Sequence, residues 1–244
     1  GNLFQLLMLD TRSIYRDKQL NIEDYFDGNT INKSKYKKDL SVDRKLIGLE
    51  QMLWIKNNLN KKFKWSIIGQ QVLMAQVYLP TIFANMNKKI LPDYLHKYLK
   101  IGGANVPYNT DAWDGYPKER ERLFKELKKA NSVLVLTGDT HNSWLNNLYD
   151  ENNNFIGVEI GTPAISSPNT IDTFGSLTDG IEEGFIKENK NVKWTEGKHK
   201  GYTLLKLTKD KSEVSFVYVN TVKSKIYKVI DTNKFNVKPN TPII

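Results

Sequence analysis

Short apolar runs that lead into polar residues recur along the first two thirds of the chain. The first leads into Asp10-Thr11-Arg12, the second ends in Gln70 and Gln71, and the third leads into Gly138-Asp139-Thr140-His141. Runs of this length, rich in Val, Ile and Leu, predict buried strands with polar residues at their carboxyl ends. The predicted strands are residues 3–9, 63–72, 132–136 and 155–160.

Helical spacing of apolar residues appears between these runs. In segment 41–60 the leucines at 46, 49 and 53 recur at helical intervals, with Ser41 or Asp43 as the expected N-cap. Segment 117–128 begins with a proline, which the first helical turn tolerates, and carries an apolar stripe at Leu123, Phe124 and Leu127. Further helices are predicted around residues 91–99 and within 178–190, and residues 10–41 are predicted to be mainly a polar loop.

The last third of the chain has a different pattern. Residues 202–207 and 213–219 alternate apolar and polar positions across the polar turn 208–212, which predicts an antiparallel hairpin. Strands that alternate with helices and end in a hairpin indicate an α/β fold. In open α/β sheets, ligands bind at the carboxyl ends of the strands, and the polar residues described above stand at those ends.

The amino-acid composition excludes several kinds of functional site. Among the 244 residues there is no cysteine, so disulfides, thiolate metal sites and cysteine nucleophiles are excluded within this chain. The net charge of +9 favours anionic partners, although the lysines are scattered and solubility alone could explain them. No apolar run approaches the roughly 20 residues of a membrane helix. The chain begins at Gly1, directly before an apolar run, and we therefore expect a fragment or a processed chain.

Asp139 and His141 are the first candidates for a functional site. Their side chains suit Zn, Mn, Fe or Ca, but two ligands do not make a site, and Asp139 could instead cap a helix while His141 is a hydrogen-bonded loop residue. Asp10 and Arg12 form a second candidate, because an arginine fork beside a carboxylate suits a phosphate next to a metal. An ion pair between Asp10 and Arg12 or Arg16 is the simpler interpretation.

Two further stretches have structural and functional interpretations. Trp113, Asp114 and Tyr116 could form a cleft wall, or simply begin the helix at Pro117 with Asp114 as its cap. His199 could be a third ligand or an acid, or an exposed loop residue. No Walker loop, Gly-x-Gly-x-x-Gly or Gly-x-Ser-x-Gly motif is present, which disfavours nucleotide-dependent kinases and serine hydrolases.

Six blocks in order resemble the PhoD-like alkaline phosphatases and phosphodiesterases. The blocks are MLDTRSIYR (8–16), IGLEQMLWIKNNL (47–59), WSIIGQQVLMAQ (65–76), AWDGYPKERERLFKEL (112–127), VLVLTGDTHNSW (133–144) and VEIGTPAISSP (158–168). The resemblance implies a metallophosphoesterase-type layered α/β sandwich, with mixed sheets and flanking helices, that ends here in the antiparallel hairpin. It also implies hydrolysis of phosphate mono- or diesters, with calcium and ferric iron as the expected metals and zinc or manganese as alternatives.

The resemblance also assigns residues. Asp139 and His141 match a metal-binding Gly-Asp-x-His motif, and Asp10 and Arg12 match a Leu-Asp-Thr-Arg motif expected to be catalytic. The expected substrate contacts are Gln70, Trp113, Tyr116 and His199.

The sequence motifs that precede these six blocks in members of the family have no counterpart in this chain. Residues 1–244 are therefore expected to be the C-terminal portion of a single PhoD-like domain, with a companion chain or lost segment carrying the first half. Export from the cell is expected from the resemblance alone. The alternatives are a non-catalytic half that binds a partner chain or an anionic polymer, and a nucleic-acid-binding module.

Overall fold

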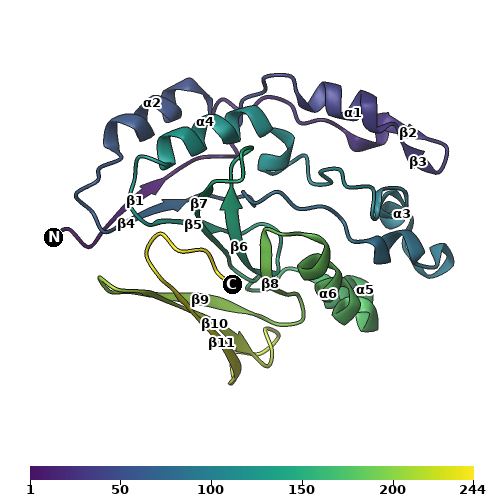
Figure 1. The fold of residues 1–244 in the computed structure, drawn as a ribbon. Helices are drawn as coiled ribbons and strands as arrows, with labels where there is room; N and C mark the ends of the chain where they lie inside the picture. Colours follow the sequence, from purple (N-terminus) through teal and green to yellow (C-terminus); the bar gives the residue numbers. More distant parts are fainter.

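The computed structural model describes residues 1–244, with the exception of the side chain of Ile90. Its central element is a six-stranded sheet, which helices cover on one face and a second sheet covers on the other (Figure 1). The strand order of the larger sheet is β1-β4-β5-β7-β6-β8. Its strands are β1 (Phe4–Met8), β4 (Trp65–Gly69), β5 (Val133–Thr137), β6 (Ser143–Tyr149), β7 (Phe155–Gly161) and β8 (Val192–Glu196).

Four of these strands are parallel, and this arrangement places the candidate residues. β1, β4, β5 and β7 pair in parallel, whereas β6 is antiparallel to both of its neighbours. Parallel neighbours require a crossover connection, which usually contains a helix. Helix α2 lies between β1 and β4 in the chain, and α4 lies between β4 and β5. The carboxyl ends of β1, β4 and β5 therefore meet at one edge of the sheet.

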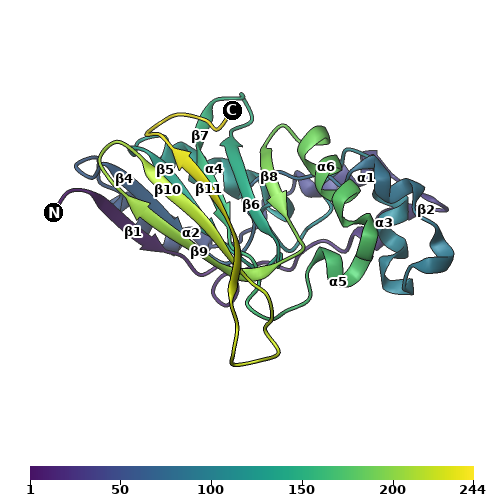
Figure 2. The ribbon, with the colours of Figure 1, turned by 90° about the horizontal axis from the view of Figure 1, so that it is seen from below.

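The helices fall into two groups. In Figure 1, α2 and α4 lie over one face of the sheet, and Figure 2 shows α1, α3, α5 and α6 beyond its β8 end. The apolar stripe of α4 is buried against the sheet, as its sequence predicts. The bounds are α1 (Lys33–Leu40), α2 (Gly48–Asn58), α3 (His96–Ile101), α4 (Pro117–Leu127), α5 (Thr170–Phe174) and α6 (Thr178–Glu188).

The smaller sheet lies under the other face of the larger one. Its order is β11-β10-β9, with all pairs antiparallel. Phe216 and Tyr218 of this sheet form a core with Trp65, Ile67 and Leu145 of the larger sheet. Its strands are β9 (Lys200–Leu207), β10 (Ser212–Val219) and β11 (Val229–Val237), and a separate two-stranded hairpin consists of β2 (Phe26–Asp27) and β3 (Thr30–Ile31).

The sequence prediction of an α/β fold with a closing hairpin is confirmed. All four predicted strands form, α4 and α6 lie within the predicted helical segments, and β9 and β10 pair across the predicted turn. A helix also forms near the predicted segment 91–99. It is α3, which occupies 96–101 and follows a short 3-10 turn.

The predicted start of the helix in segment 41–60 is wrong, and its predicted apolar stripe is buried only in part. Helix α2 begins at Gly48, and Ile47 at its N-cap position makes no capping bond through its side chain. Ser41 and Asp43 are therefore not caps, and the buried carboxylate of Glu119 accepts hydrogen bonds from the backbone N–H groups just before and at the helix start. Leu49 and Leu53 are exposed, because the helix presents Gly48 and Ile55 to the core.

Several elements were not predicted. Residues 10–41 contain α1 and the β2–β3 hairpin, although we expected a polar loop. β6 was missed because its buried polar residues, Asn146 and Asn147, interrupt the apolar pattern. β8 and β11 were also missed, and the closing hairpin is in fact part of a three-stranded sheet. Within the described part of the chain, no helix is long and apolar enough to cross a membrane.

Candidate functional site

The ends of β1, β4 and β5 are joined by hydrogen bonds of Gln71, through its side chain toward β1 and through its backbone carbonyl toward β5. Its Oε1 accepts hydrogen bonds from the backbone N (2.7 Å) and Oγ1 (2.6 Å) of Thr11, and its Nε2 donates to the carbonyl of Leu9 (3.0 Å). Its carbonyl accepts a hydrogen bond from the backbone N of Gly138 (3.1 Å). One residue thus links the segments that carry Arg12 and Asp139.

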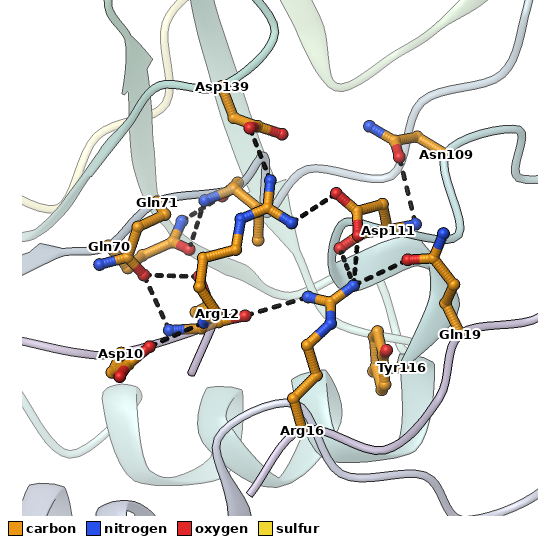
Figure 3. Close-up of polar contacts among 12 residues, drawn as sticks. Asp10, Arg12, Arg16, Gln19, Gln70, Gln71, Asn109, Asp111, Tyr116 and Asp139 are labelled. Carbon is orange, nitrogen blue, oxygen red and sulfur yellow. Dashed lines mark hydrogen bonds and ion pairs between the residues drawn. The ribbon is translucent and has the colours of Figure 1, made fainter. Parts of the chain in front are cut away.

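Arg12 is the centre of the polar cluster shown in Figure 3. Its Nη1 lies 2.5 Å from Oδ2 of Asp111, and its Nη2 lies 2.5 Å from Oδ1 of Asp139. Burial opposes the positive charge, but the hydrogen bonds to both carboxylates outweigh that effect and raise the pKa of Arg12. The side chain is still 34% exposed, so the fixed cation remains within reach of solvent.

Asp111 is shared between two arginines. Its Oδ1 lies 2.5 Å from Nη2 of Arg16, which also donates to the Asp111 carbonyl (2.8 Å). The guanidinium of Arg16 lies 5.2 Å from the centre of the Tyr116 ring, and its Nη1 donates to the carbonyl of Thr11 (3.0 Å). Because Arg16 is held on several sides, Asp111 is fixed, and Asp111 in turn fixes one end of the Arg12 fork.

The backbone that presents Asp139 and His141 is unusual. Asp139 has a φ of 68° and His141 a φ of 64°, in the left-handed region that residues other than glycine seldom occupy. The backbone N of Thr140 donates to the Gly138 carbonyl (2.8 Å), so Asp139 is the central residue of a three-residue turn. Strain of this kind costs of order 1–3 kcal/mol and is concentrated at functional sites. The turn directs the Asp139 carboxylate toward Arg12.

His141 has one ring nitrogen engaged. Its Nδ1 lies 2.7 Å from the carbonyl oxygen of Pro168, which can only accept a hydrogen bond, so Nδ1 carries the proton. In neutral imidazole this leaves Nε2 with a lone pair. A backbone carbonyl that orients a histidine in this way is the usual outer partner of a metal-binding histidine. Asp139 is followed by β6 and not by a helix, so it caps no helix.

An open pocket of about 640 Å³ lies beside this cluster. Arg12, Asp139 and both glutamines after β4 are on its polar side. Its other walls are apolar side chains of β1, β5, β7 and β9, so the pocket continues into the space between the two sheets. The arginine and carboxylate therefore lie at the mouth of a cavity large enough for a small anionic ester.

Asp10 has a different position from the one predicted. Its Oδ1 accepts hydrogen bonds from the backbone N of Arg12 and of Ser13, both at 2.8 Å, and these bonds lower the pKa of Asp10. It makes no ion pair with Arg12 or Arg16, and it does not line the pocket. In this arrangement Asp10 shapes the turn after β1, and its expected catalytic role stays a prediction that this position does not support.

Two of the expected substrate contacts are buried in the core. Trp113 is 0% exposed and donates from Nε1 to Oε1 of Gln70 (3.2 Å), and Tyr116 is 1% exposed and donates to the Asp17 carbonyl (2.8 Å). Neither lines the pocket, because both pack beneath the start of α4. Gln70 does line the pocket.

Asp114 is also a core residue and not the cap of α4. It is buried, lies 2.6 Å from Nη1 of Arg120 and accepts a hydrogen bond from the backbone N of Val77 (3.0 Å). Burial raises the pKa of Asp114, and Arg120 opposes that shift.

His199 does not line the pocket. Its Nδ1 lies 2.9 Å from Oε1 of Glu196, and its ring stacks on Tyr218 with 5.2 Å between centroids. The loop between β7 and α5 separates it from His141, since Asn169 of this loop donates to the His199 carbonyl (3.2 Å) while Pro168 accepts from His141. A direct role beside Asp139 is therefore not supported by this arrangement.

The described residues do not make a metal site by themselves. No group of three or more Asp, Glu, His or Cys side chains with metal-binding geometry occurs among them. Asp139 and His141 have the right chemistry and a suitable outer partner, but Asp139 is paired with Arg12. These two residues fit part of the ligand set of a metal site, and not a complete set.

The sequence prediction offered Arg16 only as an ion-pair partner of Asp10 and assigned no role to Asp111 or Gln71, although all three residues organise the cluster. Arg12 and the strand ends are held by Asp111, Arg16 and Gln71. Most of these contacts join residues about 60 or more positions apart, and the others cross a turn whose shape the sequence alone does not show. The only available signal was their position beside the motifs: Gln71 directly follows Gln70, and Asp111 precedes Trp113.

Comparison with known proteins matches this arrangement to one family. The family model described as PhoD-like phosphatase matches residues 1–216. Alkaline phosphatase D of Bacillus subtilis (strain 168) is 32% identical over 216 residues, which cover 85% of this chain and 31% of that protein. A solved structure titled "Structure of PhoD" superposes with a TM-score of 0.68 at 27% identity, covering 98% of this chain and 40% of that one.

The chain thus spans about a third of the length of its curated relative, and less than half of the solved structure. The matched residues 1–216 include the ends of β1, β4 and β5. The chain belongs to the PhoD-like phosphatase family.

Proposed function

We propose that this chain forms part of a metal-dependent hydrolase of phosphate mono- or diesters. The observation that carries the proposal is the Arg12 fork between Asp111 and Asp139, at a sheet edge where three strand ends meet beside a pocket of about 640 Å³. Membership of the PhoD-like phosphatase family supports the same activity. The +9 net charge would attract anionic esters, nucleic acid among them only as a substrate.

Arg12 has the charge-stabilising role in this proposal. Its fixed guanidinium offsets the charge that develops on the phosphoryl oxygens, and it needs little reorganisation because Asp111 already holds it. Asp111 and Arg16 are positioning residues. Gln70 lines the wall of the pocket and is the proposed contact to the ester, but its amide is already bonded to the backbone of Val72 and to Nε1 of Trp113, so binding the ester would require these bonds to be shared or exchanged.

Asp139 and Nε2 of His141 would hold a metal ion together with ligands from outside this chain. When bound, the metal supplies Lewis acidity, which lowers the pKa of water and polarises phosphoryl oxygens. Calcium and ferric iron are the proposed metals, with zinc or manganese as alternatives. We place residues 1–244 as the C-terminal portion of one PhoD-like domain in an exported protein, and a companion polypeptide would carry the remaining ligands.

A non-catalytic half that binds a partner is the second candidate. The absence of a three-residue metal cluster among the described side chains favours it. The two candidates differ in what the assembled material does: a hydrolase turns over phosphate esters, whereas a binding half does not.

The test is hydrolysis by the chain co-expressed with the part of Bacillus subtilis alkaline phosphatase D that it does not match. The substrates are p-nitrophenyl phosphate and bis-p-nitrophenyl phosphate, after chelation and reloading with calcium, ferric iron, zinc or manganese. We expect turnover only after reloading, and a loss on the order of 10²-fold for Asp139→Asn, which removes a charged ligand. Asp210→Asn, on an exposed turn between β9 and β10, is the control and should keep full activity. A purified assembly that is inactive with every metal refutes the proposal.

A further inference from the structure

The connection between β10 and β11 protrudes from the molecule, as the hairpin loop in Figure 2 shows. Every residue from 222 to 230 is exposed. The loop lies beyond residues 1–216, the span that matches the family model, so the family match assigns it no role. We call residues 220–230 the β10–β11 tip.

Hydrogen bonds give the β10–β11 tip a defined shape. The backbone N of Asn220 donates to the Lys228 carbonyl (3.0 Å), and the backbone N of Lys228 donates to Oδ1 of Asn220 (2.8 Å). These two bonds close the loop at its base. Within the loop, the backbone N of Ile226 donates to Oγ of Ser224 (3.0 Å). The side chains of the tip are therefore presented by a preformed loop, and little ordering is needed when a ligand binds.

The β10–β11 tip exposes large apolar side chains. Ile226 is 86% exposed, more than any other large apolar side chain except that of the C-terminal Ile244, and Tyr227 is 58% exposed. Val222, Val229 and Ile230 are also exposed. None of these tip residues belongs to either core cluster of the described side chains. Apolar side chains gathered on a surface in this way mark an interaction site.

The same loop is positively charged. Lys223, Lys225 and Lys228 are exposed among the apolar residues, and the sequence contains no Asp or Glu from Val214 to Ile230. Lys200, at the base of the hairpin, lies 2.5 Å from Asp172, so its charge is already offset. The tip therefore presents three lysines and apolar side chains to the same ligand.

We propose that the β10–β11 tip docks the protein on a lipid bilayer that contains anionic headgroups. Ile226 and Tyr227 would enter the interface, where tyrosine is enriched, and the lysines would keep their ammonium groups among the headgroup phosphates. A soluble polyanion would bind the lysines but would leave the aliphatic side chains in water. A single-stranded nucleic acid would need several stacking rings, and Tyr227 is the only aromatic residue of the tip.

Docking would also orient the candidate site. At the base of the hairpin, the backbone N of Gly201 donates to the Ala164 carbonyl (3.0 Å), which lies in the loop between β7 and α5. Pro168 of that loop accepts the hydrogen bond from His141. The tip and the ends of the parallel strands are thus joined at one edge of the molecule, and a docked tip would hold this edge near the bilayer. Binding to the bilayer does not depend on hydrolysis.

Co-sedimentation of the 244-residue chain with vesicles tests the role of charge. We expect binding to vesicles of phosphatidylcholine mixed with phosphatidylglycerol and not to phosphatidylcholine alone, and weaker binding as salt increases. Lys223→Gln, Lys225→Gln and Lys228→Gln together should lower the affinity on the order of 10²-fold. The matched control replaces the exposed Lys61, Lys62 and Lys64 with glutamine, which removes the same charge elsewhere and should change the affinity by less than about three-fold.

Two further variants test insertion of the apolar side chains. Ile226→Ser keeps every lysine and should lower the affinity about ten-fold. Ile226→Cys provides the only thiol of the chain, and a polarity-sensitive fluorophore attached there should shift its emission to shorter wavelength on anionic vesicles. Leu49→Cys, 68% exposed on α2 at the opposite face of the molecule in Figure 1, carries the same fluorophore as the control and should show no shift.

The proposal is overturned if the chain does not bind anionic vesicles, if both lysine triples weaken binding equally, or if the fluorophore at residue 226 shows no shift. Soluble polyphosphate is the competing ligand. If it binds as tightly as the vesicles do and Ile226→Ser changes neither affinity, the tip binds an anionic polymer and not a bilayer. None of these measurements requires turnover, so their outcome and that of the hydrolysis test are independent.

Discussion

Asp139 shows at the residue scale how the site combines an unfavourable backbone conformation with an ion pair. Its φ of 68° is one that a residue with a Cβ adopts at a cost, and its carboxylate is held by Arg12. The two contributions can be separated because replacement by alanine or by glycine removes the same carboxylate. Only glycine also removes the backbone penalty.

We predict that Asp139→Gly is more stable than Asp139→Ala by about 1 kcal/mol, measured by urea unfolding. The same pair of substitutions at Asp179, in the first turn of α6, is the control. There the backbone is helical, so glycine should be the less stable variant by about 1 kcal/mol. If both sites rank alanine above glycine, the turn at Asp139 is not strained.

At the scale of elements, the start of α2 depends on a residue of α4. Glu119 is 1% exposed, and its Oε2 and Oε1 accept hydrogen bonds from the backbone N of Ile47 (3.0 Å) and of Gly48 (3.1 Å), with Leu46 N as a third donor. The helix has no side-chain cap of its own. Its unpaired N–H groups and its positive end are therefore satisfied from another helix.

We predict that Glu119→Gln lowers the free energy of unfolding by about 2–3 kcal/mol, because an amide cannot accept all three bonds and loses the charge. Glu126→Gln, on the same helix but with only a surface contact to Lys129, should change it by less than about 0.5 kcal/mol. Both values come from urea denaturation at neutral pH. Equal effects would show that Glu119 does not hold the start of α2.

Periodicity predicted the elements whose apolar pattern is uninterrupted, such as β4, whose five residues are all buried, and α4 with its single stripe. It failed where a distant residue decides the outcome. The start of α2 is set by Glu119, and Asn146 is buried in β6 because it donates to Glu159 (2.9 Å). The same holds for the candidate site. Arg12 and Asp139 could be predicted because they follow the ends of predicted strands, but no local pattern in the sequence shows that Asp111 binds Arg12.

On the scale of the whole molecule, Glu159 couples stability to pH. It is 0% exposed in β7 and accepts hydrogen bonds from the backbone N of Ala75 and from Asn146, both at 2.9 Å, and from Met74 N. Burial nevertheless raises the pKa of Glu159 from 4.5 to about 7. The folded protein therefore binds a proton more tightly here than the unfolded chain does.

Between pH 4.5 and 7 the folded state holds a proton that the unfolded state releases, so this residue's contribution to stability falls as pH rises. The whole change is about 3 kcal/mol. We predict that the stability of the protein relative to Glu159→Gln decreases by most of this amount between about pH 5 and pH 8. Urea denaturation across that range measures it. A flat pH profile of the difference between the protein and Glu159→Gln would contradict the prediction.

β1 carries two features on five residues: Phe4, Leu6 and Met8 form an exposed apolar row, and the end of the strand leads directly to Arg12. A strand slipped by one residue moves about 3.3 Å and exchanges its two faces. Such a slip would turn Phe4, Leu6 and Met8 inward to the helices and withdraw Arg12 from Asp139. The parallel pairing of β1 with β4 therefore sets the register of β1 and the position of the arginine together. The pairing of these two strands thus acts as a check on the geometry of the site, because a misregistered β1 would hold Arg12 away from Asp139.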